Sequence, residues 1–386
     1  MHVDDLLSTR ALLTPARLAL SVVHEGRQYT FSELNERASR CANLLREQYG
    51  VKKGDRVGMF MPNTPQFVMA YFAILKAGGV VVATNPLYTQ KEIEYQVKDA
   101  GIEIMFVMTN YYNLMKEVQP KTKIRKLIVT NLKESLPPVL AALFTLAKEK
   151  KGGFRVQVAS DDVLMQDLIQ KHTPSQRPKL DLGPDDVALF QYSGGTTGIS
   201  KGAIAMHRNL VANALQIRSW MTNADDGKEV VVLAIPMFHV YGMVAGMLFA
   251  IYLGASMVMV PNPRDMHDVL TNLQKYKATI YPGVPTMYNA INNHPDVVAG
   301  KYNLSSIKAC ISGSAPLMRE TKEKFEALTG GSVFEGYGLS EAPTASHCNP
   351  LLGENRTGSI GLLQPVLQQH HIVVELQHLV ARILHF

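Results

Sequence analysis

The sequence predicts an α/β protein whose sheets are mostly parallel and carry helices on both faces. Two observations predict this fold class. Up to about residue 180, segments with helical apolar spacing alternate with short apolar segments typical of buried strands. After a polar stretch at 171–186, which is expected to be a linker, the alternation resumes and continues to residue 342. Helices that alternate with strands in this way connect parallel neighbours as βαβ units.

The first part of the chain is expected to begin its alternation with an amphipathic helix at 30–50. Thr30 and Glu33 have the spacing of a capping box, and Gly50 stands where the apolar spacing ends. The segments that follow are a strand at 55–61, a helix at 65–79, a strand at 80–86, a helix at 90–101, and strands at 102–108 and 126–130.

A segment at 136–151 interrupts this pattern with two prolines, a short apolar helix and a basic cluster. The favoured interpretation is a surface helix that packs on the domain, with lysines at its C-terminal end compensating the helix dipole. A helix of this composition also suits a lipid interface, so peripheral membrane contact is the alternative.

The second part of the chain contains an apolar block, 230–262, that has no Asp, Glu, Lys or Arg. Its length alone would allow it to span a membrane. However, Pro236, His239, Gly242 and Gly254 divide it, and its two ends are typical of strands. We therefore expect a strand, a loop, a helix and a strand buried in the α/β core.

The remaining elements of the second part are assigned by the same criteria. They are strands at 187–192 and 201–207, a helix at 209–221, strands at 278–285 and 306–317, a helix at 318–331, and a strand at 332–342.

Composition narrows the possible functions of the chain. Its 386 residues include 39 basic and 33 acidic side chains, a formal net charge of +6, which suits nucleotides or an anionic membrane surface. No dense basic run interleaved with aromatics is present, so nucleic acid is not an expected partner. The three cysteines, Cys41, Cys310 and Cys348, are scattered and support neither a disulfide framework nor a zinc site.

The N-terminus carries acidic residues where a secretory signal would carry basic ones. We therefore expect a cytoplasmic protein, with the inner face of the membrane as a possible site of peripheral contact. The oligomeric state is left open.

The segment YSGGTTGISKG at 192–202 has the composition of a phosphate-binding loop. Its glycines allow backbone N–H groups to curl around phosphate oxygens, and its hydroxyls and one lysine add donors and charge. It is not a Walker A motif, because Ile199 and Ser200 separate Gly198 from Lys201. A Gly/Thr-rich turn without a ligand is the alternative. The candidate residues are Ser193, Gly194, Gly195, Thr196, Thr197, Gly198 and Lys201.

Two further clusters, CISGSAPL at 310–317 and FEGYGLSE at 334–341, each consist of a short apolar strand that runs into a turn of small residues. Open α/β sheets bind ligands at the carboxyl ends of their strands. Tyr337 is suited to stack on a base, Ser340 to contact a phosphate, and Glu341 to hold a magnesium ion through its carboxylate. Taken alone, the GYG triplet is equally typical of an ordinary tight turn.

His239 lies in an otherwise apolar stretch, PMFHVYG. Most such histidines are hydrogen-bonded core residues. The alternative is a place in the wall of a pocket.

Four motifs, YSGGTTGISKG, PMFHVYGM, ISGSAPL and EGYGLSE, occur in this order and together resemble the adenylate-forming enzymes. LKAGGVVVATNPLYTQKEIEYQVKDAG is similar to a fifth block of that family. The GG of SGGTTG, the FHVYGM string and the LPPVLAALFTLAKEKK insertion make the chain most similar to bacterial long-chain fatty-acid CoA ligases. The resemblance covers about residues 1–361 and implies an N-terminal domain with two interleaved, mostly parallel sheets.

The resemblance implies a two-step reaction with ATP, a fatty acid and coenzyme A as substrates and Mg²⁺ as cofactor. The loop 193–201 is expected to hold the β- and γ-phosphates, His239 and Gly242 to line the acyl pocket, and Glu341 to bind the magnesium ion. The catalytic residues are expected to be Lys201, Ser340 and Glu341. The adenine pocket is expected to comprise Gly313, Ser314, Ala315, Pro316, Gly336, Tyr337 and Gly338.

The family pattern ends after Gly361, and residues 362–386 form a tail with four histidines that do not make a convincing metal site. No counterpart is found for the ribose-binding aspartate or for the small C-terminal domain with its lysine. We therefore expect a truncated or out-of-frame tail and impaired activity. The alternatives are a nucleotide- or acyl-binding remnant without catalysis, a chain that does not persist folded, and an enzyme that adenylates an aryl or amino acid.

Overall fold

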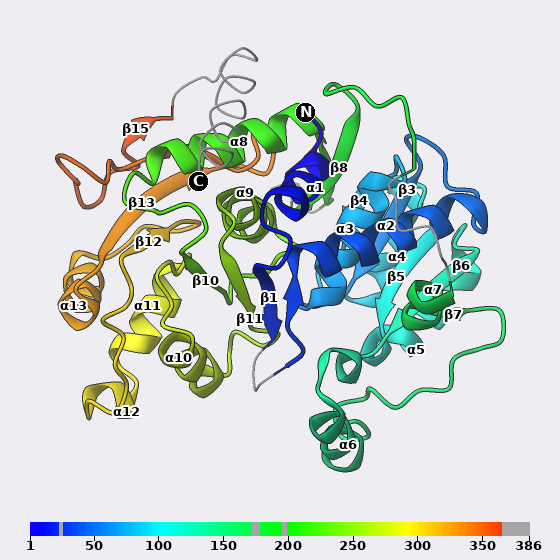
Figure 1. The fold of residues 1–386 in the computed structure, drawn as a ribbon, viewed down its shortest axis with the longest axis horizontal. Coiled ribbons are helices and arrows are strands. Elements are labelled where there is room, and N and C mark those ends of the chain that lie inside the picture. Colours follow the sequence, from blue (N-terminus) through cyan, green and yellow to red (C-terminus); the bar gives the residue numbers. More distant parts are fainter. Residues whose placement is uncertain (23–25, 172–177, 195–198, 365–386) are drawn as a thin grey trace.

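A seven-stranded sheet forms one side of the molecule (Figure 1). The computed structural model describes residues 1–22, 26–171, 178–194 and 199–364. Neighbouring strands of this sheet are parallel except the hairpin of β8 and β9, which is antiparallel. In spatial order its strands are β7 (Val163–Leu164), β6 (Lys126–Thr130), β5 (Ile104–Met108), β3 (Arg56–Phe60), β4 (Val80–Ala83), β8 (Val187–Ser193) and β9 (Lys201–Met206).

The second sheet consists of two four-stranded parts that meet at residue 280. Parallel bridges from Val231 to Ile280 and from Ile280 to Ala309 join the parts. The first part is ordered β10 (Val230–Leu233), β11 (Ser256–Met259), β1 (Leu18–Val22), β2 (Tyr29–Thr30). The second part is ordered β12 (Ala309–Ser312), β13 (Ser332–Gly338), β14 (Ala345–Cys348), β15 (Leu362–Leu363).

Helices cover both faces of the sheets, which confirms the predicted fold class. The helix α3 is buried along its whole length, and α2 packs against it. The helices are α1 (Val3–Leu13), α2 (Phe31–Glu47), α3 (Pro65–Lys76), α4 (Gln90–Ala100), α5 (Thr109–Val118), α6 (Pro138–Ala147), α7 (Met165–Lys171), α8 (His207–Trp220), α9 (Phe249–Leu253), α10 (Met266–Lys275), α11 (Pro285–Asn292), α12 (Pro295–Val298) and α13 (Arg319–Thr329), with short 3₁₀ turns η1 (Gln119–Lys121) and η2 (Leu132–Ser135).

The capping box predicted for the first amphipathic helix is present at the start of α2. The backbone N–H of Thr30 donates to the Glu33 carboxylate at 2.8 Å, and the N–H of Glu33 donates to Thr30 Oγ1 at 3.2 Å. The same exchange occurs between Thr89 and Glu92 at the start of α4. These pairs satisfy backbone donors that an uncapped first turn would leave without a partner.

The apolar block forms β10, a loop, the π-helix η3 (Tyr241–Leu248), α9 and β11, as the sequence predicts. Within the described residues, no helix has both the length and the apolar character needed to cross a membrane. The block is apolar throughout because β10 and β11 are neighbouring parallel strands and η3 and α9 are buried in the core.

The strand expected at 278–285 was a wrong prediction. Only Ile280 and Gly283 make isolated bridges to neighbouring strands. Pro282 lacks a backbone N–H for a ladder, and Pro285 is already the first residue of α11. The segment therefore lies between β10 and β12 and bridges to both of them without forming a regular strand.

Candidate active site

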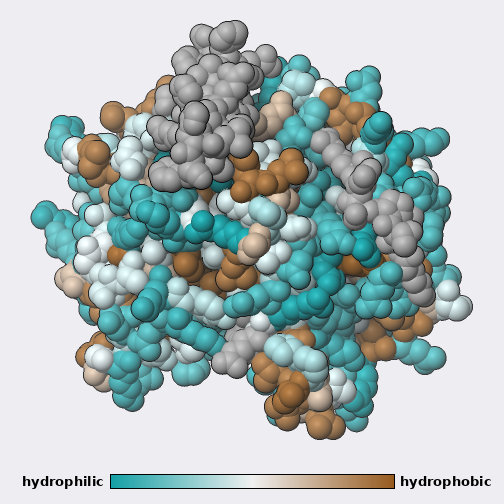
Figure 2. Space-filling model, in the orientation of Figure 1, coloured by the Kyte–Doolittle hydropathy of each residue, from teal (hydrophilic) through white to brown (hydrophobic). Residues whose placement is uncertain are grey.

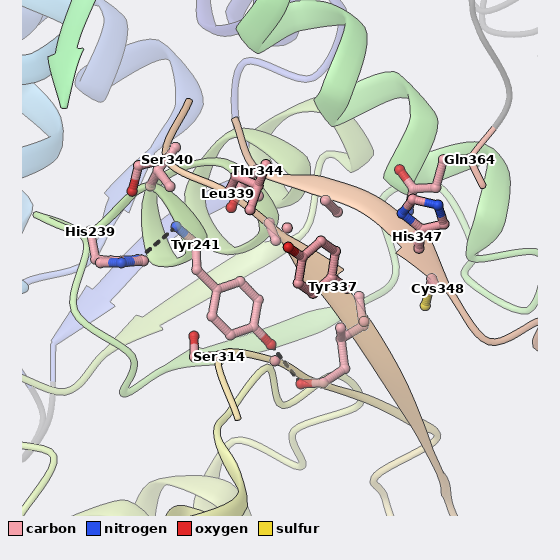
Figure 3. A pocket seen from close by; sticks show the side chains of 17 residues that line it. His239, Tyr241, Ser314, Tyr337, Leu339, Ser340, Thr344, His347, Cys348 and Gln364 are labelled. Carbon is pink, nitrogen blue, oxygen red and sulfur yellow. Dashed lines mark hydrogen bonds between the residues drawn. The ribbon is translucent and has the colours of Figure 1, made fainter. Parts of the chain in front are cut away.

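A cavity of about 240 Å³ opens where β12, β13 and η3 meet (Figure 3). Strands β12 and β13 are parallel neighbours, with Ile311 opposite Phe334, so their carboxyl ends lie side by side. The N-terminal end of η3 and the strand β14 complete the wall. The lining residues are His239, Val240, Tyr241, Ala245, Ile311, Gly313, Ser314, Gly336, Tyr337, Gly338, Leu339, Ser340, Thr344, Ala345, His347, Cys348 and Gln364.

Two glycines, Gly313 after β12 and Gly336 on β13, leave bare backbone at the cavity, and Gly336 also packs closely on β12. A Cβ on Gly313 would lie 3.4 Å from the Tyr241 ring, and one on Gly336 would lie 3.2 Å from Ile311 Cγ2. The next residue, Ser314, has a φ of 69°, which non-glycine residues rarely adopt. Such strained backbone is common where a loop is shaped around a ligand.

Tyr337 lines the cavity, and 43% of the residue's surface is exposed. It meets the His347 ring edge-on, with centroids 6.2 Å apart. The following residue, Gly338, approaches the backbone of Thr344 so closely that a Cβ there would collide with the Thr344 carbonyl oxygen. The exposed ring therefore stands beside bare backbone, an arrangement that can accept a flat aromatic ligand.

His239 and Tyr241 form the opposite wall. The backbone N–H of Tyr241 donates to His239 Nδ1 at 3.2 Å, and the Tyr241 hydroxyl donates to the carbonyl of Ile311 at 2.6 Å. Burial lowers the pKa of His239, and the N–H donated to Nδ1 also favours the neutral ring. Burial raises the pKa of Tyr241, so this hydroxyl keeps its proton. The wall is thus uncharged at neutral pH.

The predicted phosphate loop leaves the sheet between β8 and β9. Ser193 and Lys201 are cross-strand partners at its neck, and the Ser200 hydroxyl donates to the Ser193 carbonyl at 2.9 Å. Lys201 is exposed, and within the described residues it makes no ion pair. Residues 195–198, which include Gly195, Thr196, Thr197 and Gly198, lie outside the described residues.

A hydrogen bond connects β8, which leads into this loop, to the cavity wall. The Gln191 side-chain amide donates to the carbonyl of Phe238 at 3.2 Å, next to His239. Gln191 lies on β8, two residues before Ser193. The neck of the predicted phosphate loop and the histidine wall are therefore anchored to each other.

Asn63 is a positioning residue that the sequence reasoning missed. Its side-chain amide donates to the carbonyls of Leu233 at 3.0 Å and Ile235 at 2.8 Å, and its Oδ1 accepts from the N–H of Met237 at 2.8 Å. Asn63 follows β3, so this buried side chain holds the histidine loop against the first sheet. The only signal in the sequence is an asparagine between two prolines, PNTP, after a strand.

Asn213 on α8 was missed in the same way. Its Oδ1 accepts from the N–H groups of Thr344 at 2.8 Å and Ala345 at 3.1 Å, and its Nδ2 donates to the Ala345 carbonyl at 2.6 Å. Both partners line the cavity. Another missed residue is Gln364, which is buried in the wall and whose Oε1 has no hydrogen-bond partner within the described part of the chain.

We expect Asn213→Ala to lower the free energy of unfolding by about 2–3 kcal/mol, because two backbone N–H groups and a carbonyl lose their partner. Urea denaturation followed by circular dichroism measures this change. The matched control is Asn289→Ala on the exposed side of α11, with an expected change of about 0.5 kcal/mol or less. Equal effects of the two substitutions would contradict the clamping role of Asn213.

Several predicted residues do not line the cavity. Ala315 and Pro316 are exposed beyond its edge, and Glu341 is exposed one residue after the lining residue Ser340. Gly242 is buried, and its Cα faces the backbone of Pro236. Packing explains the glycine at this position, and its acyl-pocket role stays a prediction.

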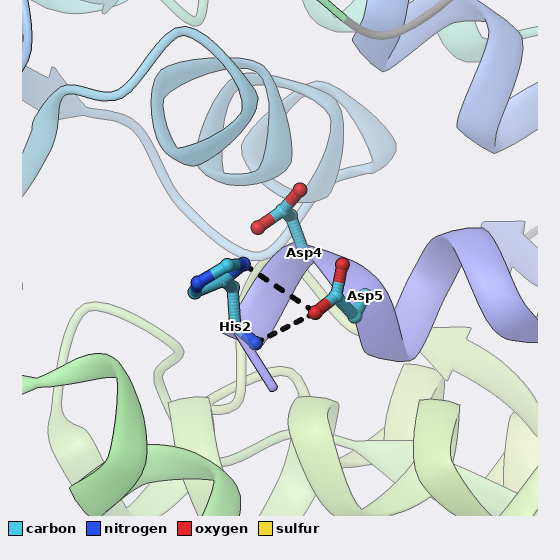
Figure 4. Close-up of side chains that lie close together, drawn as sticks. All are labelled: His2, Asp4 and Asp5. Carbon is cyan, nitrogen blue, oxygen red and sulfur yellow. Dashed lines mark hydrogen bonds and ion pairs between the residues drawn. The ribbon is translucent and has the colours of Figure 1, made fainter. Parts of the chain in front are cut away.

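The described residues contain one group of three potential metal ligands, at the N-terminal end of α1 (Figure 4). It comprises His2, Asp4 and Asp5, with His2 Nδ1 3.5 Å from Asp5 Oδ2. The backbone N–H of Val3 donates to His207 Nδ1, which attaches this helix to α8. The group does not include Glu341, so it does not correspond to the predicted magnesium site.

Comparison with known proteins places this chain in a family. A family model described as "AMP-binding enzyme" matches residues 7–380. The chain belongs to this family. The chain is 37% identical over 366 residues to a long-chain-fatty-acid–CoA ligase of Bacillus subtilis, and 34% identical over 345 residues to one of Yersinia pestis. These matches cover 94% and 89% of the chain, and they confirm the resemblance inferred from the four motifs.

The fold of the chain also matches that of solved structures. A long-chain-fatty-acid-CoA ligase from Archaeoglobus fulgidus superposes with a TM-score of 0.79 at 23% identity, over 94% of this chain and 69% of that one. The chain spans 64% and 61% of the Bacillus and Yersinia relatives, respectively. The domain boundary at residue 361 stays a prediction.

Proposed function

We propose that the chain carries the nucleotide- and acyl-binding part of a long-chain fatty-acid CoA ligase. The observation that supports this function best is the cavity. It collects Gly313 and Ser314 from one predicted adenine segment, Tyr337 and Ser340 from the other, and His239 from the predicted acyl wall. These residues come from three separate motifs, and ordinary core packing does not require them to share one opening.

The proposed reaction has two steps. In the first, a carboxylate oxygen of the fatty acid attacks the α-phosphorus of ATP, the bond from that phosphorus to the bridging oxygen breaks, and pyrophosphate leaves. In the second, the coenzyme A thiol loses its proton to solvent, its sulfur attacks the acyl carbonyl carbon, the bond from that carbon to the acyl–phosphate oxygen breaks, and AMP leaves with that oxygen. Phosphoryl chemistry of this type depends on positioning and on neutralising phosphate charge.

The described residues fit these tasks in the following way. The Tyr337 ring stacks on the adenine, and the bare backbone at Gly313 and Gly336 admits its edge. Ser340 donates to the α-phosphate, and Lys201 at the loop neck neutralises the β- and γ-phosphates. The acyl carboxylate then lies near His239. Because the His239 ring is neutral, it neither repels a magnesium ion nor attracts the phosphates away from Lys201.

The donor set near Ser340 fits a magnesium ion. Mg²⁺ is usually held by one or two carboxylates together with substrate phosphates and waters, and Glu341 offers one exposed carboxylate beside the cavity. When bound, the ion would neutralise phosphate charge. Glu341 is the residue that would hold it.

The first test is carboxylate-dependent ATP–pyrophosphate exchange on the purified chain, with magnesium and with acids from acetate to palmitate. We expect exchange that increases with chain length, since each buried methylene contributes about 0.8 kcal/mol. Benzoate and amino acids serve as comparison substrates. A preference for benzoate or for an amino acid would replace the fatty-acid assignment.

Exchange has to be measured together with ATP binding and with a folding check. A folded chain that binds ATP but gives no exchange with any acid would be a nucleotide-binding part that needs the remainder of a longer ligase. That result would contradict the expected exchange and would leave a binding part without adenylation activity, whereas a folded chain that does not bind ATP would overturn the proposal itself.

A further inference from the structure

The helix α6 turns an apolar stripe outward. None of its ten residues is buried, and Val139, Leu143 and Leu146 are 72%, 55% and 82% exposed. Together with Ala142 and Ala147, which are also exposed, they occupy positions i, i+3, i+4, i+7 and i+8. A surface helix usually places such a stripe against the core. In α6 the stripe faces away from the protein.

The opposite face of α6 attaches it to the protein. Phe144 meets Phe154 edge-on with ring centroids 5.4 Å apart, and the carbonyl of Thr145 accepts a hydrogen bond from Arg155 at 3.3 Å. The helix also packs on η2. In Figure 1, α6 projects at the lower edge of the molecule. These contacts orient the helix and leave the stripe uncovered.

The charges next to the stripe are basic. Lys148, Lys150, Lys151 and Arg155 follow the helix and are exposed. The one acidic residue between 136 and 160, Glu149, is buried and accepts from the Lys133 ammonium at 2.6 Å. Figure 2 shows hydrophobic side chains gathered at this edge, where α6 lies.

We propose that α6 docks the protein on an anionic lipid surface, with its apolar stripe among the acyl chains and the basic cluster at the headgroups. An interfacial helix combines an apolar face with flanking lysines in this manner. The charge complementarity favours lipid over a second copy of the chain, because two copies would bring the same basic clusters together. The stripe of a ten-residue helix is also small for a stable dimer, which buries about 800 Å² on each partner.

The test uses the 386-residue chain and sedimentation with vesicles, and it does not depend on ligase activity. One vesicle set is phosphatidylcholine alone, and the other mixes phosphatidylcholine with phosphatidylglycerol. We expect binding to the anionic set that weakens as salt is raised. Leu143→Glu/Leu146→Glu should weaken it about ten-fold or more, because two carboxylates would enter the apolar layer.

Two further variants separate the stripe from general surface effects. Lys150→Gln/Lys151→Gln should weaken anionic-vesicle binding about five-fold for each lysine replaced. The matched control is Leu12→Glu on α1, since Leu12 is 83% exposed, as Leu146 is 82% exposed. This control should bind as the unaltered chain does. Thermal unfolding by circular dichroism checks that each variant is folded.

Three outcomes would overturn the proposal. The first is no binding of the unaltered chain to anionic vesicles. The second is an equal loss of binding for Leu12→Glu and for the α6 variants. The third is a dimer of the unaltered chain, detected by sedimentation velocity without lipid, together with an absence of vesicle binding. If the α6 variants dissociate that dimer, the stripe is an interface between copies of the chain.

Discussion

Replacing Lys201 by alanine should lower the rate of ATP–pyrophosphate exchange about 100- to 1,000-fold, by analogy with the loss of one donor from a preorganised oxyanion hole. Lys201 begins β9, opposite Ser193 at the neck of the glycine-rich loop, and its ammonium makes no ion pair within the described residues. Its charge is therefore available to the phosphates, where charge develops as pyrophosphate leaves.

The affinity for ATP, measured by calorimetry, should also fall in the Lys201→Ala variant. This measurement tests the prediction even if the exchange rate is low. Lys228→Ala is the control, because Lys228 is an exposed lysine that does not line the cavity. This control should leave exchange and affinity unchanged. If Lys201→Ala binds ATP and exchanges pyrophosphate as Lys228→Ala does, the loop does not hold the phosphates through this lysine.

Replacing Gly242 by alanine should lower the free energy of unfolding by about 3 kcal/mol, the upper part of the range for overpacking a core. The added Cβ would meet the carbonyl oxygen of Pro236 and lie 2.7 Å from its carbonyl carbon. Both are backbone atoms of the loop that carries His239, and Asn63 holds that loop in place. The loop cannot yield without breaking those hydrogen bonds.

Gly246→Ala, in the same π-helix, is the matched control for Gly242→Ala. Its Cβ would meet Leu233 Cδ2 at 2.6 Å, the far end of a side chain that can rotate. The higher helix propensity of alanine offsets part of the contact, so the net change should be about 1 kcal/mol or less. Urea denaturation measures both variants. Similar midpoints for the two would mean that the backbone contact at Gly242 is not tight.

The strands that enter the candidate site could be predicted because their signals are local. β12 and β13 are short apolar segments that end in small residues, and the capping box of α2 lies within four neighbouring residues. The four motifs are also short contiguous segments, so the family could be assigned from the sequence. Strand β1, Leu18–Val22, was missed, because its parallel partner β11 is far along the chain and its other neighbour, β2, has only two residues.

Several site residues could not be predicted because their partners are distant in the sequence. Asn213 contacts Thr344 across 131 positions, and Asn63 contacts Met237 across 174. An isolated asparagine carries no pattern that indicates which backbone groups it will satisfy. Burial decides which backbone groups the asparagine contacts, because an N–H or carbonyl removed from water needs a partner from whichever element packs beside it.

The sequence by itself determined the alternation of helices and strands, the glycine-rich turns and the membership of the AMP-binding family, since each depends on neighbouring residues and their spacing. The tertiary structure alone decided that Tyr337, Ser314 and His239 share one cavity, and that the apolar stripe of α6 faces outward. Both follow from how sheets and helices bury surface against each other, which is a property of the packed chain and not of any one segment.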